Sequence, residues 1–147
     1  MNNIEIDFYH KEKEFIPVYS TEGSSGADIK AYIPNENWII DAWCRALIPT
    51  GLFVNIPKGY ELQIRPRSGL AYRHGVFAVF GTIDSDYRGE IKVLLMNNSP
   101  VQFTVENGMR IAQFICSSVN QAEWKIVRKE ELSEPERGEG GFGSTGV

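Results

Sequence analysis

Residues 52–65, Leu-Phe-Val-Asn-Ile-Pro-Lys-Gly-Tyr-Glu-Leu-Gln-Ile-Arg, contain the clearest structural pattern in the chain. Every second side chain is apolar from Leu52 to Ile56, and again from Tyr60 to Ile64. The sequence Pro57-Lys58-Gly59 separates the two runs and is typical of a turn. Because successive side chains of a strand point to opposite faces of a sheet, this period of two predicts two β-strands joined by a turn.

Short runs of the same kind recur along the chain and indicate an all-β fold. Further strand-like runs are Ile4–Phe8, Glu90–Asn97, Val101–Val105, Ile111–Ser117 and Glu123–Val127. Turn signals such as Asn97-Asn98-Ser99-Pro100 and Asn107-Gly108 separate them. This spacing favours a β-sandwich or barrel over βαβ units.

Two stretches differ from this pattern. Ser68–Gly75 offers an N-cap serine and a C-terminal glycine around a single short helix. From Ser133 the composition changes, and five of the last ten residues are glycine. We therefore expect one β core over residues 1–132 and a mobile, glycine-rich arm over residues 133–147.

Composition excludes several classes of function. The chain has 147 residues, a length that suits one domain, and a formal net charge of −4. That balance gives no electrostatic footprint for nucleic acid or an anionic membrane, and the longest apolar run, Val76–Phe80, is too short to span a bilayer. With no leader-like N-terminus, and with Cys44 and Cys116 expected to be buried free thiols, a cytoplasmic protein is predicted. His10 and His74 are the only histidines, too few for a His/Cys zinc site.

Two internal segments carry candidate chemistry. Arg65–Ala71 predicts a strand that leads into the short helix, where backbone N–H groups and the Arg67 guanidinium suit a phosphate. The alternative is a capped helix with a surface arginine. Gly81–Gly89 follows the apolar run 76–80 and predicts a β-hairpin whose descending limb carries two carboxylates and a tyrosine. A carboxylate beside phosphate can deprotonate an attacking water, and the alternative is an acidic turn capped by its own side chains.

The last segment, Arg137–Gly146, combines glycines that let a backbone wrap phosphates with an arginine and one phenylalanine that can stack on a base. The alternative is a disordered tail. Two weaker segments, Ser25–Ile29 and Gly108–Gln113, each indicate no more than a turn followed by a strand.

In this order and at these spacings, the five segments resemble the five motifs of the trimeric dUTP pyrophosphatase (dUTPase) family. The resemblance runs from Pro17 to Gly146 and has no gap inside Pro-Arg-Ser-Gly-Leu-Ala or Gly-Thr-Ile-Asp-Ser-Asp-Tyr-Arg-Gly. It implies a jelly-roll-like all-β subunit that forms a homotrimer with shared active sites. It also implies hydrolysis of dUTP to dUMP and pyrophosphate with Mg²⁺ on the triphosphate, which limits uracil in DNA and supplies dUMP.

The resemblance also implies a role for individual residues. Asp84 is expected to be the general base, and Tyr87 to pack under the deoxyribose. The backbone of Gly81, Thr82 and Ile83 is expected to recognise uracil, with Lys92 contributing from the adjacent strand. The expected phosphate ligands are Arg67, Ser68, Gly69 and Gln113, and the arm would add Arg137, Gly143, Ser144 and Thr145 over the γ-phosphate and Phe142 over the base. Asp28 is expected to act through waters of the Mg²⁺ shell, with no side chain bound directly to the metal.

The chain departs from the family pattern at one point. Many members carry Asn-x-Pro-Gly before the catalytic segment, whereas Phe77–Gly81 here has no amide side chain, so uracil discrimination must depend on backbone groups and steric fit. Two other activities fit the same scaffold: a dCTP deaminase, which needs Arg-Ser-Ser and a catalytic glutamate that find no good match here, and a non-catalytic nucleotide-binding regulator.

Overall fold

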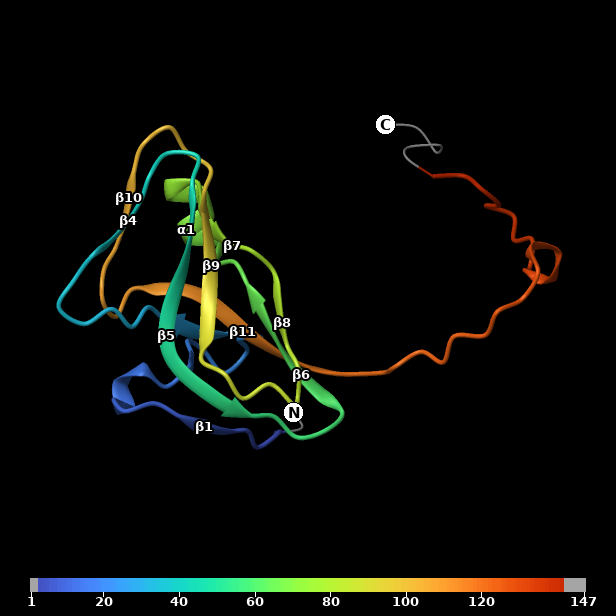
Figure 1. Ribbon diagram of the computed structural model, residues 1–147, viewed down its shortest axis with the longest axis horizontal. Coiled ribbons are helices and arrows are strands. Elements are labelled where there is room, and N and C mark those ends of the chain that lie inside the picture. Colours follow the sequence, from blue (N-terminus) through green and yellow to red (C-terminus); the bar gives the residue numbers. More distant parts are fainter. Residues whose placement is uncertain (1–2, 142–147) are drawn as a thin grey trace.

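The computed structural model describes residues 3–141, which form eleven strands, one α-helix and two short 3₁₀ helices (Figure 1). The strands are β1 (Asp7–Tyr9), β2 (Val18–Tyr19), β3 (Ala27–Lys30), β4 (Trp38–Ile40), β5 (Arg45–Asn55), β6 (Tyr60–Arg65), β7 (Val76–Ala78), β8 (Gly81–Ile83), β9 (Ile91–Asn97), β10 (Phe103–Val105) and β11 (Arg110–Ser118). The helices are α1 (Ser68–His74), η1 (Lys13–Phe15) and η2 (Lys129–Glu131). The predicted all-β class with a single short helix is confirmed.

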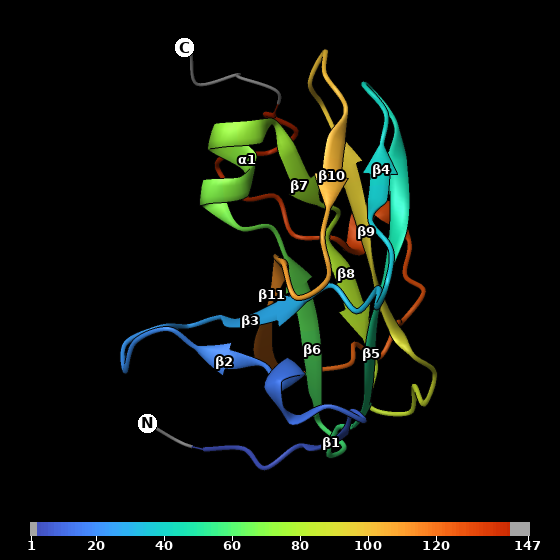
Figure 2. The same ribbon diagram turned by 90° about the vertical axis from the view of Figure 1, so that its left-hand side faces the viewer.

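Two antiparallel sheets pack against each other to form a β-sandwich (Figure 2). One sheet has the strand order β1-β5-β9-β7, the other has the order β2-β3-β11-β6-β8, and β4 and β10 form a separate ribbon. The core between the sheets holds the inward residues of both, among them Ile48, Leu52, Val93 and Leu95 from the first sheet and Ile64, Ile111 and Phe114 from the second. Burial of these apolar side chains is the main force that stabilises the sandwich.

The stretch 52–65 forms the end of β5 and all of β6, as its alternation predicts. Leu52 and Val54 are buried on β5, and Leu62 and Ile64 are buried on β6. The two strands belong to different sheets, so the turn at 57–59 carries the chain from one layer to the other. Period two identified the strands but not the sheet that each one joins.

The hairpin predicted around Gly81 is wrong. The strand β7 pairs with β9 in the first sheet, whereas β8 pairs with β6 in the second, so Val79 and Phe80 connect two layers. Glu123–Val127 was also expected to be a strand and has no regular structure. An isolated extended segment lacks hydrogen-bond partners, and none is supplied within the described part of the chain.

The helix α1 ends as its sequence predicts. Gly75 is its C-cap in the left-handed conformation, with φ of 67°, and the Gly75 N–H donates to the Ala71 carbonyl at 2.9 Å. At the other end Arg67, and not Ser68, is the N-cap residue, and no side chain caps the helix. The cysteines are both free as expected, but Cys44 is exposed and Cys116 half-buried, so the prediction of buried thiols is wrong. Partial burial still raises the pKa of the Cys116 thiol.

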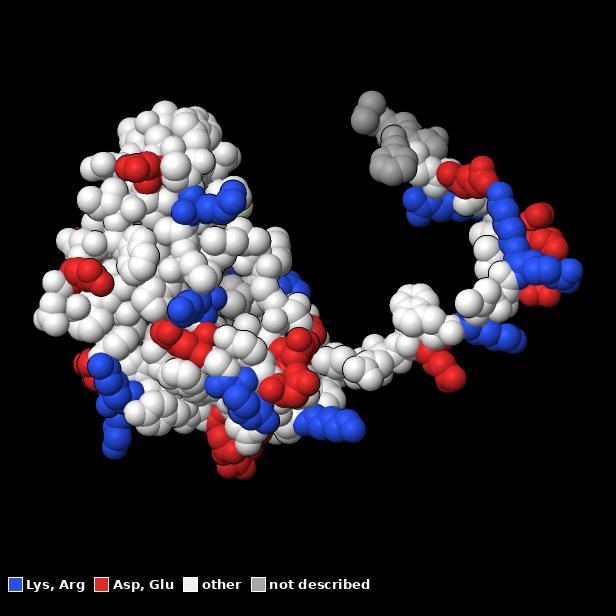
Figure 3. Space-filling model, in the orientation of Figure 1, with Lys and Arg blue, Asp and Glu red and all other residues white. Residues whose placement is uncertain are grey.

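After β11 the chain leaves the sandwich, and residues 119–141 run away from it in Figure 1. Trp124 is 91% exposed and Ile126 is 97% exposed on this segment. On the face shown in Figure 3, acidic and basic side chains lie mixed over the body and along the segment. Among the described residues, no helix is long and apolar enough to cross a membrane.

Candidate active site

A first group of polar side chains lies at the end of the second sheet where β6 leads into α1. Register places Asp28 on β3, Gln113 on β11 and Arg65 on β6 in one row across the sheet. Arg67 follows β6 by two residues, so its side chain reaches back over this row. We call Asp28, Arg67, Arg110 and Gln113 the arginine cluster.

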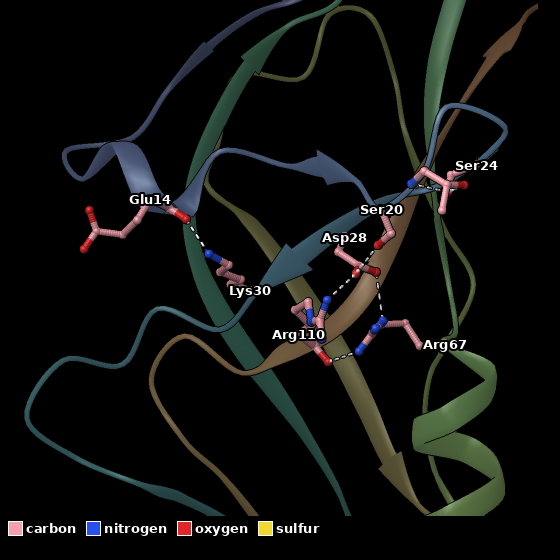
Figure 4. Close-up of polar contacts among 8 residues, drawn as sticks. Glu14, Ser20, Ser24, Asp28, Lys30, Arg67 and Arg110 are labelled. Atoms are coloured by element: carbon pink, nitrogen blue, oxygen red, sulfur yellow. Dashed lines mark hydrogen bonds and ion pairs between the residues drawn. The ribbon is translucent and has the colours of Figure 1, made fainter.

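Two guanidinium groups hold the Asp28 carboxylate in this cluster (Figure 4). Arg67 Nε lies 2.8 Å from Asp28 Oδ1, and Arg110 Nη1 lies 3.4 Å from Asp28 Oδ2. Arg67 Nη1 also donates to the Arg110 carbonyl at 3.1 Å. The Asp28 side chain is only 12% exposed, whereas Arg110 keeps 56% of its side chain in contact with solvent. Two cations against one anion leave a net positive charge and open guanidinium donors for an anionic ligand.

Gln113 joins the cluster to the start of α1. Its Nε2 donates to the Pro66 carbonyl at 2.9 Å, which holds the segment that leads to Arg67 against β11. Ser68 and Gly69 come next and begin α1, so the predicted residues of this motif lie side by side. Sequence reasoning had selected Gln113 but missed Arg110. The only signal for Arg110 was its place in the weak segment 108–113, because nothing in a single sequence shows that Arg110 reaches Asp28.

A second group surrounds the tight turn after β8. Because this turn carries Asp84, the candidate general base, we call residues 84–89 the catalytic turn. The Tyr87 N–H donates to the Asp84 carbonyl at 3.1 Å and closes the turn. The Tyr87 hydroxyl donates to the Glu90 carbonyl at 2.9 Å, so the ring folds back over Gly89. A Cβ at Gly89 would lie 2.5 Å from the Tyr87 hydroxyl oxygen, so only glycine admits this ring position.

The catalytic turn borders a cavity of about 410 Å³. Its lining includes five residues selected from the sequence, together with three others: Thr82, Ile83, Asp84, Tyr87 and Lys92, then Leu47, Glu90 and Ile91. The Lys92 ammonium lies 3.9 Å from the Glu90 carboxylate, whose other oxygen accepts the Gly51 N–H at 3.0 Å. Glu90 therefore orients Lys92, a contact that the sequence did not suggest.

Two open strand edges face this cavity. The strand β8 pairs with β6 along Gly81–Ile83, and β9 pairs with β5 and β7, but no pairing joins β8 to β9 in the described part of the chain. The strand β7 covers the other edge of β9 only as far as Leu94, whose carbonyl accepts the Val79 N–H. The edges of Gly81–Ile83 and Ile91–Val93 thus offer backbone donors and acceptors to a planar ligand.

The arginine cluster and the catalytic turn are far apart within one chain. Ile83 lies opposite Leu62, so Asp84 continues opposite Glu61, six residues before Arg67. At about 3.3 Å per residue, the two groups are separated by about 20 Å along the sheet. This separation exceeds the length of a triphosphate chain, so the two groups of one chain do not meet on the same phosphates.

Comparison with known proteins identifies the family. The family model described as dUTPase matches residues 12–146. A deoxyuridine 5′-triphosphate nucleotidohydrolase of Roseobacter denitrificans is 51% identical over 133 residues, which cover 89% of this chain and 86% of the relative. A protein of the same name from Fusobacterium nucleatum is 47% identical over 148 residues, which cover 99% of both chains. This chain belongs to the dUTPase family.

Solved structures agree with this assignment. The dUTPase of Staphylococcus bacteriophage 80alpha, solved with dUpNHpp, is similar with a TM-score of 0.86 and 26% identity, and the match covers 97% of this chain and 99% of the phage chain. The dUTPase fold is the jelly-roll type expected from the sequence, and the sandwich described above conforms to it.

The remaining expectations for this dUTPase concern its C-terminal segment and its metal. Arg137 is described, and its Nε donates to the Gly140 carbonyl at 2.9 Å, on a segment remote from both groups in Figure 1. Phe142, Gly143, Ser144 and Thr145 lie outside the described residues. No three His, Cys, Asp or Glu side chains of residues 3–141 come together as a ligand set. Asp28 is the carboxylate of the arginine cluster, and its contacts there are with Arg67 and Arg110.

Proposed function

We propose that this protein hydrolyses dUTP to dUMP and pyrophosphate, and so limits uracil in DNA and supplies dUMP. The observation that carries this proposal is the cavity between the open edges of β8 and β9, which Asp84 and Tyr87 border in a chain of the dUTPase family. A planar base, a sugar and a water activated by a carboxylate are the components that this reaction requires.

Base and sugar recognition follow from the cavity. Uracil presents two carbonyls around one N–H, and the backbones of Gly81, Thr82 and Ile83 offer the complementary groups, with Lys92 at the opposite wall. The Tyr87 ring supports the deoxyribose. The Tyr87 hydroxyl donates to the Glu90 carbonyl and so holds the ring in place, and a ring pressed against C2′ leaves no room for a 2′-hydroxyl. The absence of an Asn side chain at Phe77–Gly81 leaves uracil selection to these backbone groups and to steric fit.

Asp84 is the proposed general base. Its carboxylate takes a proton from a water whose oxygen forms the new bond to the α-phosphorus, and the bond to the pyrophosphate oxygen breaks. Loss of a general base typically lowers the rate by about 10²–10⁴-fold. Placement of Asp84 at the end of β8, on a turn closed by its own backbone, restricts the directions in which the carboxylate can point.

The arginine cluster is the proposed triphosphate site. Arg67 and Arg110 supply charged donors, and Gln113, Ser68 and Gly69 shape the backbone around them. Bound Mg²⁺ would neutralise and orient the phosphate oxygens, and Asp28 would accept hydrogen bonds from its waters. This arrangement suits a hard cation that keeps several waters and is held mainly by the substrate.

We assign the complete site to a homotrimer. The separation of about 20 Å between the two groups requires that different subunits supply them. An apolar row of Leu47, Leu94, Met96 and Phe77 crosses the outer face of the first sheet, where a sandwich exposed to water carries polar residues. Trp124 and Ile126 on the segment after β11 likewise need a protein surface to cover them. Cyclic symmetry lets every subunit give one group and receive the other.

Residues 133–147 are proposed to close over the bound nucleotide, with Arg137, Gly143, Ser144 and Thr145 on the γ-phosphate and Phe142 on the base. Closure of such a segment excludes water and fixes the reacting phosphorus. The two free cysteines are consistent with a reducing compartment, and we assign the protein to the cytoplasm.

A panel of dUTP, dTTP, dCTP and UTP with Mg²⁺ tests the activity. Pyrophosphate release from dUTP far above the other three supports the proposal. Ammonia released from dCTP would instead identify a deaminase, and tight dUTP binding without turnover would identify a regulator. Light scattering tests the assembly, because a homotrimer of a 16.6 kDa chain has a mass of about 50 kDa.

A further inference from the structure

Arg88 makes a set of contacts that the activity described above does not use. It follows Tyr87 in the catalytic turn, and its side chain folds back over that turn. Its Nη1 donates to the Ser85 carbonyl at 2.8 Å and to the Tyr87 carbonyl at 2.9 Å. Its Nη2 donates to the Asn55 side-chain oxygen at 2.9 Å. One planar guanidinium therefore joins two peptide groups of the turn to the end of β5.

Asn55 is itself held from the other side. It is the last residue of β5 and lies opposite Asp7 on β1. Its Nδ2 donates to Asp7 Oδ2 at 3.0 Å. Because the amide oxygen must face Arg88 while the amide nitrogen faces Asp7, only one orientation of the Asn55 amide satisfies both neighbours. The N-terminal strand thus reaches the catalytic turn through one side chain.

The turn has few restraints of its own. Its backbone is closed by the hydrogen bond between Tyr87 N–H and the Asp84 carbonyl, and the ring of Tyr87 is tied to Glu90. One of the two carbonyls that Arg88 holds belongs to the Ser85–Asp86 peptide, and the other belongs to the Tyr87–Arg88 peptide. Arg88 therefore orients one peptide plane between Asp84 and Tyr87 and the peptide plane that directly follows Tyr87.

We propose that Arg88, oriented by Asn55 and Asp7, is a positioning residue that holds the Asp84 carboxylate and the Tyr87 ring in their catalytic arrangement. This inference rests on the proposed role of Asp84. The contacts of Arg88 described above run to backbone carbonyls and to Asn55, so it acts through the turn. A misplacement of about 1 Å at a reacting group can cost about 100-fold in rate.

Arg88→Met tests the proposal because it keeps an unbranched side chain of similar length and removes the donors. We expect kcat for dUTP to fall about 10- to 100-fold while KM changes less than about 3-fold. Arg88→Lys should be intermediate, since an ammonium cannot reproduce the planar fork. Lys58→Met is the matched control: it removes an exposed cation from the turn beside Asn55 and should leave kcat unchanged.

A reversal of hydrogen-bond polarity tests the link to β1. Asn55→Asp places two carboxylates face to face and should lower kcat. Addition of Asp7→Asn should restore it to within about 3-fold of wild type, because the new amide at position 7 donates to the carboxylate at position 55, which still accepts from Arg88. The assay is run well below the unfolding temperature, where a loss of stability alone leaves kcat unchanged.

Amide hydrogen exchange of residues 84–90 supplies a readout that is independent of turnover. Arg88→Met should speed exchange in this peptide and leave the β5 and β9 peptides unchanged. Unchanged exchange, a wild-type kcat for Arg88→Met, or no rescue in the double variant would each overturn the positioning role. A wild-type protein that fails to hydrolyse dUTP would overturn the proposed function instead, and exchange would still decide whether Arg88 holds the turn.

Discussion

Two variants, Arg67→Met and Asp84→Asn, should regain activity together although each is nearly inactive alone. Arg67→Met disables the arginine cluster, where Arg67 Nε lies 2.8 Å from Asp28, and leaves the catalytic turn intact. Asp84→Asn does the reverse. The register of β6 and β8 places the two groups about 20 Å apart in one chain, and we therefore propose that a complete site takes them from different subunits.

The size of the recovery follows from this geometry. In an equal mixture half of the arginine clusters and half of the catalytic turns are intact. If assembly is random, about a quarter of the sites combine an intact group of each kind. Since loss of the base costs about 10²–10⁴-fold, the mixture should be at least about 25-fold more active than Asp84→Asn alone.

The assay is release of pyrophosphate from dUTP after the two variants are unfolded together in urea and refolded. Wild-type protein treated in the same way corrects for incomplete refolding. The folded variants mixed without unfolding show how much activity arises without exchange of subunits. If the jointly refolded mixture stays at the level of the separate variants, the two groups act within one chain, and the reasoning from strand register is refuted.

Four further outcomes are expected. Asp84→Asn should lower kcat about 10²–10⁴-fold and leave nucleotide binding in place, as measured by calorimetry. UTP should show a far lower kcat/KM than dUTP because the Tyr87 ring, held by its bond to the Glu90 carbonyl, leaves no room for a 2′-hydroxyl, and equal values would contradict this role. Removal of residues 137–147 should leave the melting temperature and subunit mass unchanged while most activity is lost; full activity would show that the arm is no lid. Asn97→Ala should lower the free energy of unfolding, measured by urea titration, by about 3–5 kcal/mol. The reason is that the buried Asn97 amide donates to the carbonyls of Ile40, Asp41 and Val101. The control Asn98→Ala, at an exposed position, should change this free energy by less than about 0.5 kcal/mol.

Local sequence predicted the strands well and their partners poorly. The alternation in residues 52–65 identified β5 and β6, and Gly75 correctly marked the end of α1. The same alternation also suggested a strand at Glu123–Val127, where the described chain forms none. Periodicity reports which side chains can share a face, whereas a strand also needs a neighbour for its backbone hydrogen bonds.

The candidate site shows the same division. Local chemistry pointed to Arg67 and to the carboxylates of Gly81–Gly89, because glycine-bounded turns and charged residues remain visible in a linear sequence. Asp28 and Gln113 were selected only through the resemblance to the dUTPase motifs. Arg110 was missed because its contact with Asp28 joins positions 82 residues apart, which no local pattern records.

By itself, the sequence determined the all-β class, the position of the single helix and the segments that carry chemistry. Local propensity and side-chain alternation specify these features over a few residues at a time. Only the tertiary structure decided that β7 and β8 enter different sheets, that β8 and β9 leave their edges open around a cavity, and that the arginine cluster lies far from Asp84. Such features depend on strand order and register, and these are set by how apolar faces from distant parts of the chain pack together in one core.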